Sequence, residues 1–271
     1  MFLVANMTKY IPNTTMLSPS DIAFVLDPTQ PVLTHSRSMV AESAIEPHAH
    51  PRGQLLWGSK GILRVTSEKA VWVVPSTHAV WIPGGHYHQV SNETATQTRN
   101  LYVDPSFCVR QNSDKVVMLK MSSLLREVIL KLTESAGSLA KERAHNLGLV
   151  ALDELESLEA MELYIPSGHD PRLQRLSSLI VNQPDQSLLL EQLANQVGAS
   201  VRTIERLFKA ETGLTFRQWR SRFRLMSSLD KISQGYNTTL VAHELGYSSV
   251  SSFISSFKKL FGCTPQEYAQ R

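Results

Sequence analysis

Three histidines have the residue type and spacing that metal binding requires. His48 and His50 are two positions apart, so on an extended strand their side chains point to the same side. His88, from a later segment, can complete a group of three imidazoles, which are ligands that many divalent transition metals prefer. Gln54 adds an amide oxygen, a weaker ligand than a carboxylate because it carries no charge. This group predicts either a divalent metal site or interior histidines that pair with one another, with water or with an organic effector.

Two neighbours of this group are candidates for binding a small molecule. Arg52 lies between the histidine pair and Gln54, where it can bind an anionic effector or simply lie on a loop. Trp57 lies in an apolar run, where tryptophan usually packs in a core but can also line a pocket. The predicted effector-binding residues are His48, His50, Arg52, Gln54, Trp57 and His88.

The surrounding segment, residues 21–115, is typical of a β-rich domain. Short apolar and β-branched runs are broken by Pro, Gly and Asn, and turn signals recur every ~8–12 residues. This pattern favours an antiparallel barrel or sandwich over a parallel sheet. Residues 1–20 are rich in Thr, Asn, Ser and Pro and are expected to form a loosely held lead-in.

The apolar period becomes helical across residues 116–163. Two amphipathic helices are expected, the first from Val116 onwards and the second from Ser138 to about Glu162, with Gly137 between them. Their apolar faces can pack against the outside of the barrel or form a dimer interface, and periodicity alone does not decide between the two.

A linker and a second domain follow. Residues 164–169 combine Pro, Ser and Gly and are the expected linker. Asp170 as N-cap and Pro171 at the first helical position then open a helical domain that spans residues 170–271. In that domain, Ser187 is expected to cap the second helix.

Charge is distributed unevenly along the 271 residues. Residues 170–271 hold 13 Lys and Arg against 8 Asp and Glu, whereas the rest of the chain holds 14 against 16. A basic C-terminal part predicts a polyanionic partner for that part only. The 42% of apolar residues excludes a disordered chain, and no apolar run approaches the ~20 residues of a membrane span. We expect a cytoplasmic protein without a membrane partner, in which both cysteines are reduced thiols.

The last hundred residues contain one helical pattern twice. Matching residues of the two copies are 49 positions apart, and a repeat of this length indicates duplication. Each copy predicts a short helix, a glycine turn and a longer helix, which is the helix-turn-helix arrangement of DNA-binding proteins. Upstream matches are offset by 48 rather than 49 residues, so the second copy has one extra turn residue. The 49-residue matches are Phe208-Lys209 with Phe257-Lys258, Gly213 with Gly262, Thr215 with Thr264, and Trp219 with Tyr268.

The outward faces of the two longer helices hold the candidate DNA contacts. Arg202 and Arg206 are the best candidates for reading bases, because arginine bonds guanine through both O6 and N7. The second helix is expected to bury Phe253, Phe257 and Leu260 and to grip phosphate more than to read bases, because serine has little base preference. The candidate contacts are Val201, Arg202, Glu205, Arg206 and Lys209 in the first copy and Ser249, Val250, Ser251, Ser252, Ser255 and Lys258 in the second.

These C-terminal residues carry a family resemblance. The series Ala242, Gly246-Tyr247, Phe253, Phe257-Lys258, Gly262, Thr264-Pro265 and Tyr268 is similar to the signature of the AraC/XylS family of bacterial transcription regulators. The resemblance covers about one hundred residues. It implies two helix-turn-helix units, joined by a long helix, that enter successive major grooves of double-stranded promoter DNA. RNA polymerase is a further candidate partner, and the resemblance implies neither activation nor repression.

The N-terminal motif resembles the cupin pattern. Its residues are His48-x-His50, Gln54, Gly61, Pro83-x-Gly85, His88 and Asn92. Metal-binding cupins place two His, a Glu and a third His around a divalent metal. Here Gln54 stands at the Glu position and Thr77 replaces a leading Gly, and the first departure puts the metal in doubt.

Together the two halves predict an α+β protein with two domains. An N-terminal, cupin-like antiparallel β-barrel is followed by helices, and the C-terminal domain is an all-α double helix-turn-helix. The predicted function is that of a non-enzymatic, sequence-specific DNA-binding regulator, a homodimer that responds to a small-molecule effector in the barrel.

Two alternatives stay open. One is a metal-dependent cupin enzyme fused to DNA-binding helices; many oxygenases need a carboxylate ligand, which Gln54 does not supply. The other is a constitutive DNA-binding dimer, whose affinity for DNA would not change with any ligand.

Overall fold

The computed structural model describes residues 14–61, 63–67, 70–92, 95–110, 115–134, 138–161, 163–166, 168, 170–182 and 188–270. The chain divides into two compact units. The N-terminal unit contains Asn13–Ser67 and Trp72–Tyr164, and the C-terminal unit contains Glu68–Val71 and Ile165–Arg271. Within the described ranges, no helix is long and apolar enough to cross a membrane.

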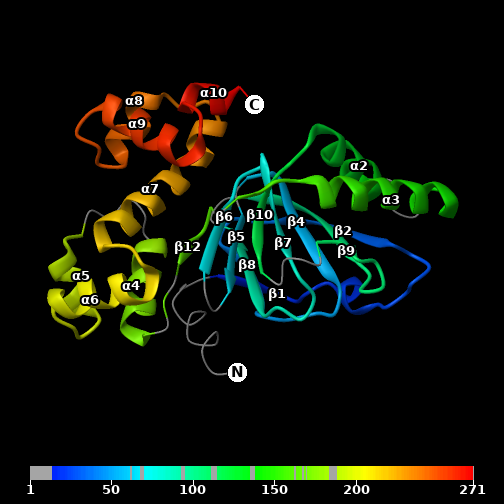
Figure 1. The fold of residues 1–271 in the computed structure, drawn as a ribbon, viewed down its shortest axis with the longest axis horizontal. Helices are drawn as coiled ribbons and strands as arrows, with labels where there is room; N and C mark the ends of the chain where they lie inside the picture. Colours follow the sequence, from blue (N-terminus) through cyan, green and yellow to red (C-terminus); the bar gives the residue numbers. More distant parts are fainter. Residues whose placement is uncertain are drawn as a thin grey trace. The chain divides into compact units, whose positions relative to one another are not determined.

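Two six-stranded sheets form the N-terminal part of the chain (Figure 1). The first sheet has the order β1 (Thr15–Leu17), β3 (Ser43–Ile45), β8 (His88–Asn92), β5 (Leu63–Ser67), β6 (Ala70–Val74) and β12 (Ile165–Pro166). The second sheet has the order β11 (Ala160–Met161), β10 (Val117–Lys120), β7 (His78–Ile82), β4 (Gly53–Lys60), β9 (Thr96–Val103) and β2 (Val32–Met39). Strands β1 and β3 run parallel, and the pairs β3–β8, β8–β5, β6–β12, β11–β10, β10–β7, β7–β4, β4–β9 and β9–β2 are antiparallel.

The predicted fold class is confirmed, with corrections to its strands. The strands form two sheets rather than a single closed barrel. Part of the expected lead-in is ordered, because Thr15–Leu17 pairs with Ser43–Ile45 as β1; residues 1–13 lie outside the described ranges. Part of the expected linker is also a strand, because Ile165 pairs with Val71.

A helical pair covers the outer face of the second sheet. The helices α2 (Ser123–Glu134) and α3 (Lys141–Ser157) lie side by side in Figure 1. Their apolar faces bury Ile129 and Leu155 against Trp57 and Trp81 of the sheet. Burying side chains of this size stabilises the fold by about 1.5–3 kcal/mol each. One of the two expected uses of these helices, packing against the sheet, is therefore observed.

The beginning of this region differs from the helical expectation. Val117–Lys120 is strand β10, and Leu119 points into the core beneath the helices, so its helical spacing with later leucines is coincidental. The second helix ends at Ser157, before strand β11. The expected break at Gly137 lies outside the described residues.

The C-terminal unit is entirely helical after β12. Figure 1 shows the long helix α7 running between a group made of α4, α5 and α6 and a group made of α8, α9 and α10. Buried aromatic side chains on α6, α7 and α9 form its core, among them Phe208, Trp219 and Phe257. The helices are α4 (Pro171–Asn182), α5 (Leu190–Gln196), α6 (Val201–Thr212), α7 (Phe216–Ser233), α8 (Thr238–Glu244), α9 (Val250–Phe261) and α10 (Pro265–Ala269).

Two local expectations in this unit need correction. Helix α5 begins at Leu190 with Leu189 as its N-cap residue, two positions after the expected cap Ser187, which lies outside the described residues. In α9, Phe261 is buried and Leu260 only partly so. The helical period places Phe261 four residues after Phe257, on the same face.

Candidate functional site

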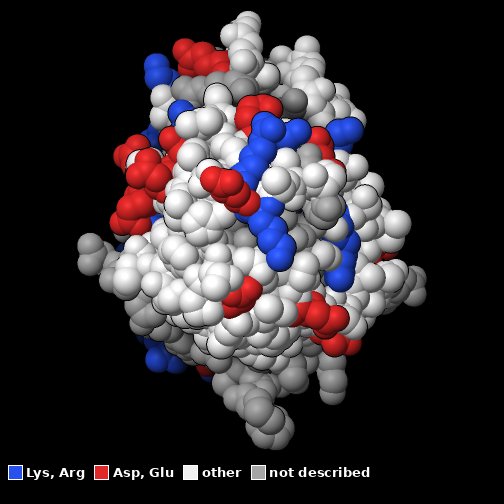
Figure 2. Space-filling model, turned by 90° about the vertical axis from the view of Figure 1, so that its right-hand side faces the viewer, with Lys and Arg blue, Asp and Glu red and all other residues white. Residues whose placement is uncertain are grey.

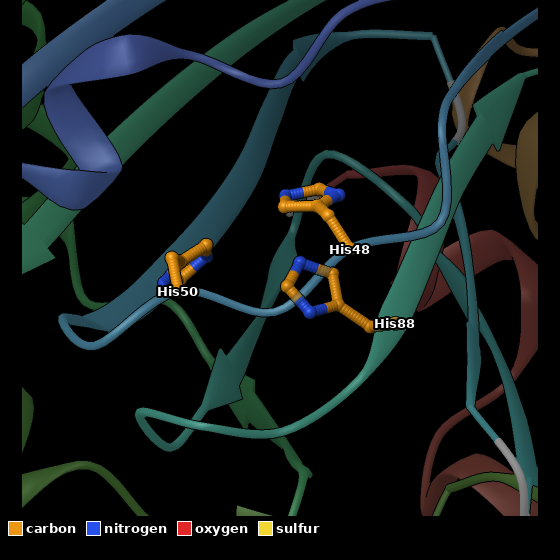
Figure 3. Close-up of side chains that lie close together, drawn as sticks. All are labelled: His48, His50 and His88. Atoms are coloured by element: carbon orange, nitrogen blue, oxygen red, sulfur yellow. The ribbon is translucent and has the colours of Figure 1, made fainter. Parts of the chain in front are cut away.

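The three histidines of the N-terminal motif converge in the structure (Figure 3). His48 and His50 lie on the segment before β4, and His88 is the first residue of β8. One ring nitrogen from each lies within 4.8 Å of the others. His50 and His88 are buried, and His48 is partly exposed.

Backbone contacts hold these segments in register. His48 and His88 exchange two backbone hydrogen bonds of 3.0 and 2.9 Å, so their side chains leave neighbouring positions of one bridge. The turn before β8 adds a third bond, from the Gly85 N–H to the carbonyl of His50. A Cβ on Gly84 would lie 2.2 Å from the Pro51 carbonyl oxygen, so only glycine fits at this close approach.

Contacts between the imidazole rings and backbone carbonyls fix which nitrogen of each ring carries a proton. The Nδ1 atoms of His48, His50 and His88 lie 2.7, 2.7 and 2.9 Å from the backbone carbonyls of Glu46, Arg52 and His86. A carbonyl oxygen only accepts, so each Nδ1 must donate. In a neutral ring the lone pair then lies on Nε2, which is the arrangement found in metal-binding histidines.

Two of the Nε2 atoms have surroundings that suit a cation. Nε2 of His88 is buried without a hydrogen-bond partner within the described residues. Nε2 of His50 lies 2.9 Å from Oε1 of Gln54, while the Gln54 amide nitrogen donates to Oδ1 of Asn100. The lone pairs of His50 Nε2 and Gln54 Oε1 repel each other at this distance. A proton on the ring, rotation of the amide or a cation between the two atoms would remove this repulsion.

The donor set therefore fits a transition metal. Nitrogens that share one zinc ion at its usual bond length lie roughly 3.3 Å apart, so small side-chain rotations would bring these rings together. Burial, reinforced by His48, lowers the pKa of His88 to about 3, and burial also lowers the pKa of His48. Both rings are then neutral at pH 7, the form that binds metals.

Arg52 lies beside the cluster but points away from it into the protein. Its guanidinium is fully buried, bonds the carbonyls of Val25 and Tyr102, and lies 3.1 Å from the Asp104 carboxylate. Burial alone raises the pKa of Asp104, but donors from Ser106 and the charge of Arg52 hold this pKa below its ordinary value. Arg52 thus ties the start of β4 to the end of β9.

The C-terminal unit carries two matching helix-turn-helix units, α5 with α6 and α8 with α9, which are called the reading units below. Ser200 and Ser249 cap α6 and α9, each accepting a hydrogen bond from the N–H three residues on. Both helices end at glycines in the left-handed region, Gly213 and Gly262. The turn before α9 is one residue longer than the turn before α6, as expected from the sequence offset.

The helix faces opposite the buried aromatic residues carry the predicted contacts. On α6, Arg202 and Arg206 are exposed, whereas Ile204 and Phe208 are buried. On α9 the exposed face is mainly serine. Exposed candidate contacts are Arg202, Glu205, Arg206, Lys209, Ser249, Ser251, Ser252, Ser255 and Lys258, and Val201 and Val250 are partly buried.

Comparison with known proteins agrees with this architecture. A family model described as a helix-turn-helix domain matches residues 193–271. The HTH-type transcriptional regulator NimR of Escherichia coli strain K12 is 35% identical over 225 residues, which are 83% of this chain and 82% of NimR. The chain belongs to the AraC family of transcription regulators.

Other proteins match this chain over different lengths. The activator RhaR of Mannheimia succiniciproducens is 30% identical over 101 residues, 37% of this chain and of RhaR. Among solved structures, ToxT of Vibrio cholerae covers 89% of this chain and 98% of its own, at 12% identity and a TM-score of 0.37. An AraC-type regulator of Chromobacterium violaceum covers 37% of this chain and 90% of its own, at 28% identity and a TM-score of 0.35. The family assignment does not depend on the structural likenesses.

Two of the predicted effector residues of this AraC-family chain are placed elsewhere. Arg52 is neither on a loop surface nor free to bind a ligand, because Asp104 and backbone carbonyls occupy its guanidinium. Trp57 lies on the face of β4 opposite Gln54, packed under α2 and α3, with its indole N–H on the Ser76 carbonyl. Side chains alternate along a strand, so positions 54 and 57 face opposite ways.

Sequence reasoning missed a set of buried polar residues on the inner face of the second sheet. Thr98, Asn100 and Tyr102 alternate along β9 and are each at most 3% exposed. Their period of two was the available signal, but Gln97 and Arg99 between them are also polar and concealed it. They lie beside His48 and Gln54 in one pocket.

The Arg52–Asp104 pair gives a stability prediction. Asp104→Asn removes the carboxylate that lies 3.1 Å from the buried guanidinium and leaves only the more distant charge of Asp27 acting on it, so it should lower the free energy of unfolding by about 3 kcal/mol in urea denaturation at pH 7. The deficit should shrink as pH falls below about 4, because the depressed pKa of Asp104 makes its stabilisation present above the unfolded pKa and lost on protonation. Glu134→Gln, at an exposed ion pair of 3.8 Å with Arg99, is the control and should change stability by under about 1 kcal/mol. An equal effect of both variants would contradict the assignment.

Proposed function

We propose that this AraC-family chain binds promoter DNA through both reading units and changes its DNA affinity when the N-terminal unit binds a small molecule. The carrying observation is the pair of capped helices α6 and α9, which expose polar faces from a duplicated scaffold on either side of α7. A helix presented in this way fits the major groove. A constitutive dimer is the competing function, and it lacks a use for the polar interior of the N-terminal unit.

The two units divide the work unequally. Helix α6 supplies Arg202 and Arg206 for bidentate contacts with guanine, so it is the discriminating reader. Helix α9 supplies hydroxyls and Lys258, which suit phosphate oxygens and give little base preference. Specificity should therefore be concentrated in one half of the binding site.

A further part of the proposal is a metal in the three-histidine cluster. His48, His50 and His88 would hold a divalent transition metal through their Nε2 atoms, with the neutral Gln54 amide in place of a carboxylate. The bound ion would supply a positive charge at the wall of the interior pocket. Support comes from the three anchored Nδ1 atoms and from the unpaired Nε2 of His88.

The dimer that we propose uses an exposed stripe on α3. Leu149 and Val150 are 42% and 40% exposed at its centre, with Arg143 towards one end and Glu156 towards the other. An antiparallel second copy would place Leu149 against Val150 and Arg143 against Glu156, twice by symmetry. Figure 2 shows the side on which α2 and α3 lie in Figure 1, with acidic and basic side chains interspersed among neutral ones. A mixed surface of this kind suits a copy of itself better than a polyanion.

The DNA-reading assignment predicts the behaviour of Arg206→Ala. Loss of a bidentate guanine contact should weaken binding to the cognate site by roughly 1–3 kcal/mol and change binding to random DNA less. Fluorescence anisotropy across a salt series measures both, with fragments of the upstream intergenic region as the specific DNA. Arg175→Ala, at an exposed arginine of α4, is the matched control. An equal loss on random DNA would mean that Arg206 contacts phosphate.

The metal proposal predicts metal content. After dialysis against zinc, the full chain should retain about one zinc per chain by mass spectrometry, and His88→Ala should lose it. His243→Ala, at an exposed histidine of α8, is the control and should retain the metal. Gln54→Glu should tighten zinc binding because it adds a charged ligand. Full zinc retention by His88→Ala would refute the site.

The dimer proposal predicts a charge-swap pattern in sedimentation velocity at low salt. Arg143→Glu should weaken self-association roughly 5–30-fold, because two attractive pairs of about 0.5–1 kcal/mol are lost. Glu156→Arg also removes the hydrogen bond that the Glu156 carboxylate accepts from the Arg110 N–H, so combining it with Arg143→Glu should restore most of the association. Lys131→Glu on α2 should leave association unchanged. Failure of the combined variant to restore dimers would exclude this pairing.

A further inference from the structure

An interior pocket of the N-terminal unit lies next to the histidine cluster. Its wall on the second sheet comes from three neighbouring strands, with His35 beside Asn100 and Arg37 beside Thr98 in the β2–β9 register. Gln54 of β4 lies opposite Tyr102 in the next pair. These side chains share one face of the sheet because each is two residues from the next along its strand.

The charge of this pocket is one-sided. Arg37 is the cation among its lining residues, and no aspartate or glutamate lines it within the described part of the chain. Burial and the charge of Arg37 lower the pKa of His35, so His35 is a neutral hydrogen-bonding group at pH 7. A cationic ligand would find no counter-charge here, whereas an anion would find one.

Two further polar side chains of the pocket wall can donate hydrogen bonds. Asn100 and Tyr102 are each 3% exposed, and Oδ1 of Asn100 accepts from Gln54. Both side chains line the pocket, where the Asn100 amide and the Tyr102 hydroxyl can donate hydrogen bonds. Buried polar groups in proteins are normally paired, so a pocket lined in this way favours a polar ligand.

The size of the pocket limits the ligand. The free volume of the pocket is about 10 Å³, close to the roughly 10–15 Å³ that a single water molecule needs. The Arg37 guanidinium donates to the Ser18 carbonyl at 2.7 Å, and the adjoining Pro19 and Ser20 line the pocket. A carboxylate bonds arginine more strongly than a neutral carbonyl does, so the ligand can displace the Ser18 carbonyl from Arg37. The ligand would then occupy the space that Ser18, Pro19 and Ser20 fill in this structure.

We propose that this pocket binds a short, hydrophilic carboxylic acid in its ionised form. The carboxylate group of the ligand would bond Arg37, and the other oxygens of the ligand would bond Asn100 and Tyr102. The inference rests on the proposed sensor function and names the chemical class of its effector. A long acyl chain does not fit, because the free volume of the pocket is only about 10 Å³.

Calorimetry on the full-length protein without DNA tests the proposal. The probes are glycolate, pyruvate and malonate, with glycolamide as the neutral match of glycolate and octanoate as the long-chain anion. At least one short carboxylate should bind about tenfold or more tightly than glycolamide and octanoate. Equal binding of glycolamide, tighter binding of octanoate or no binding of any short carboxylate overturns it.

Variants locate the site. Arg37→Met should weaken the binding of the best carboxylate about tenfold or more, Arg37→Lys less, and Tyr102→Phe by a smaller factor. Arg99→Met is the control, because Arg99 lies between Thr98 and Asn100 on the opposite face of β9. Unchanged binding by a folded Arg37→Met variant, with the fold checked by circular dichroism, contradicts the assignment.

A separate measurement distinguishes the two proposals. Anisotropy with promoter DNA is repeated with and without the carboxylate that calorimetry selects. Binding that leaves DNA affinity unchanged would overturn the sensor function while the pocket assignment stands. A DNA response to another ligand, with no short carboxylate bound, would overturn the pocket assignment alone.

Discussion

The buried pair of Arg52 and Asp104 is the interaction on which the N-terminal unit depends. An unpaired guanidinium in the interior costs several kcal/mol, so the start of β4, the end of β9 and the carbonyl of Val25 must all be in place together. The backbone carbonyl of Arg52 also accepts a hydrogen bond from the imidazole Nδ1–H of His50. The residue that stabilises the sheet thus also sets the proton position on one member of the histidine cluster.

The C-terminal unit is shaped by interactions between residues that are close together in the sequence. Its two copies share serine N-caps, glycine C-caps and a buried aromatic residue at the same place, Phe208 in one and Phe257 in the other. Each of these devices acts within a few residues, so each copy can hold its shape while its outer face varies. The arginines of α6 and the serines of α9 are that variation, placed on an unchanged support.

The sequence predicted those features that arise from short-range rules. The duplicated glycine turns and the shared side of His48 and His50 follow from local geometry, and both appear in the structure. Arg52 could not be placed in this way, because its partner Asp104 is 52 positions away and nothing near Arg52 signals it. Leu119 was misjudged because one apolar spacing suits a strand end and a helix equally. The apolar spacing of α3 is the same whether its exposed stripe faces solvent or a second chain, so the spacing does not predict a partner.

The register of β2 with β9 has a consequence for the order of folding. It joins Val32 to Val103, and β4 lies against both β7 and β9, so the second sheet needs chain segments far apart in sequence before its contacts form. The reading units close over about fifty residues each. Low contact order favours rapid folding, so the half that is synthesised last has the simpler search, a difference that refolding kinetics of the two halves would register. The N-terminal unit, although it is made first, cannot form its interior until β9 and β10 have been made.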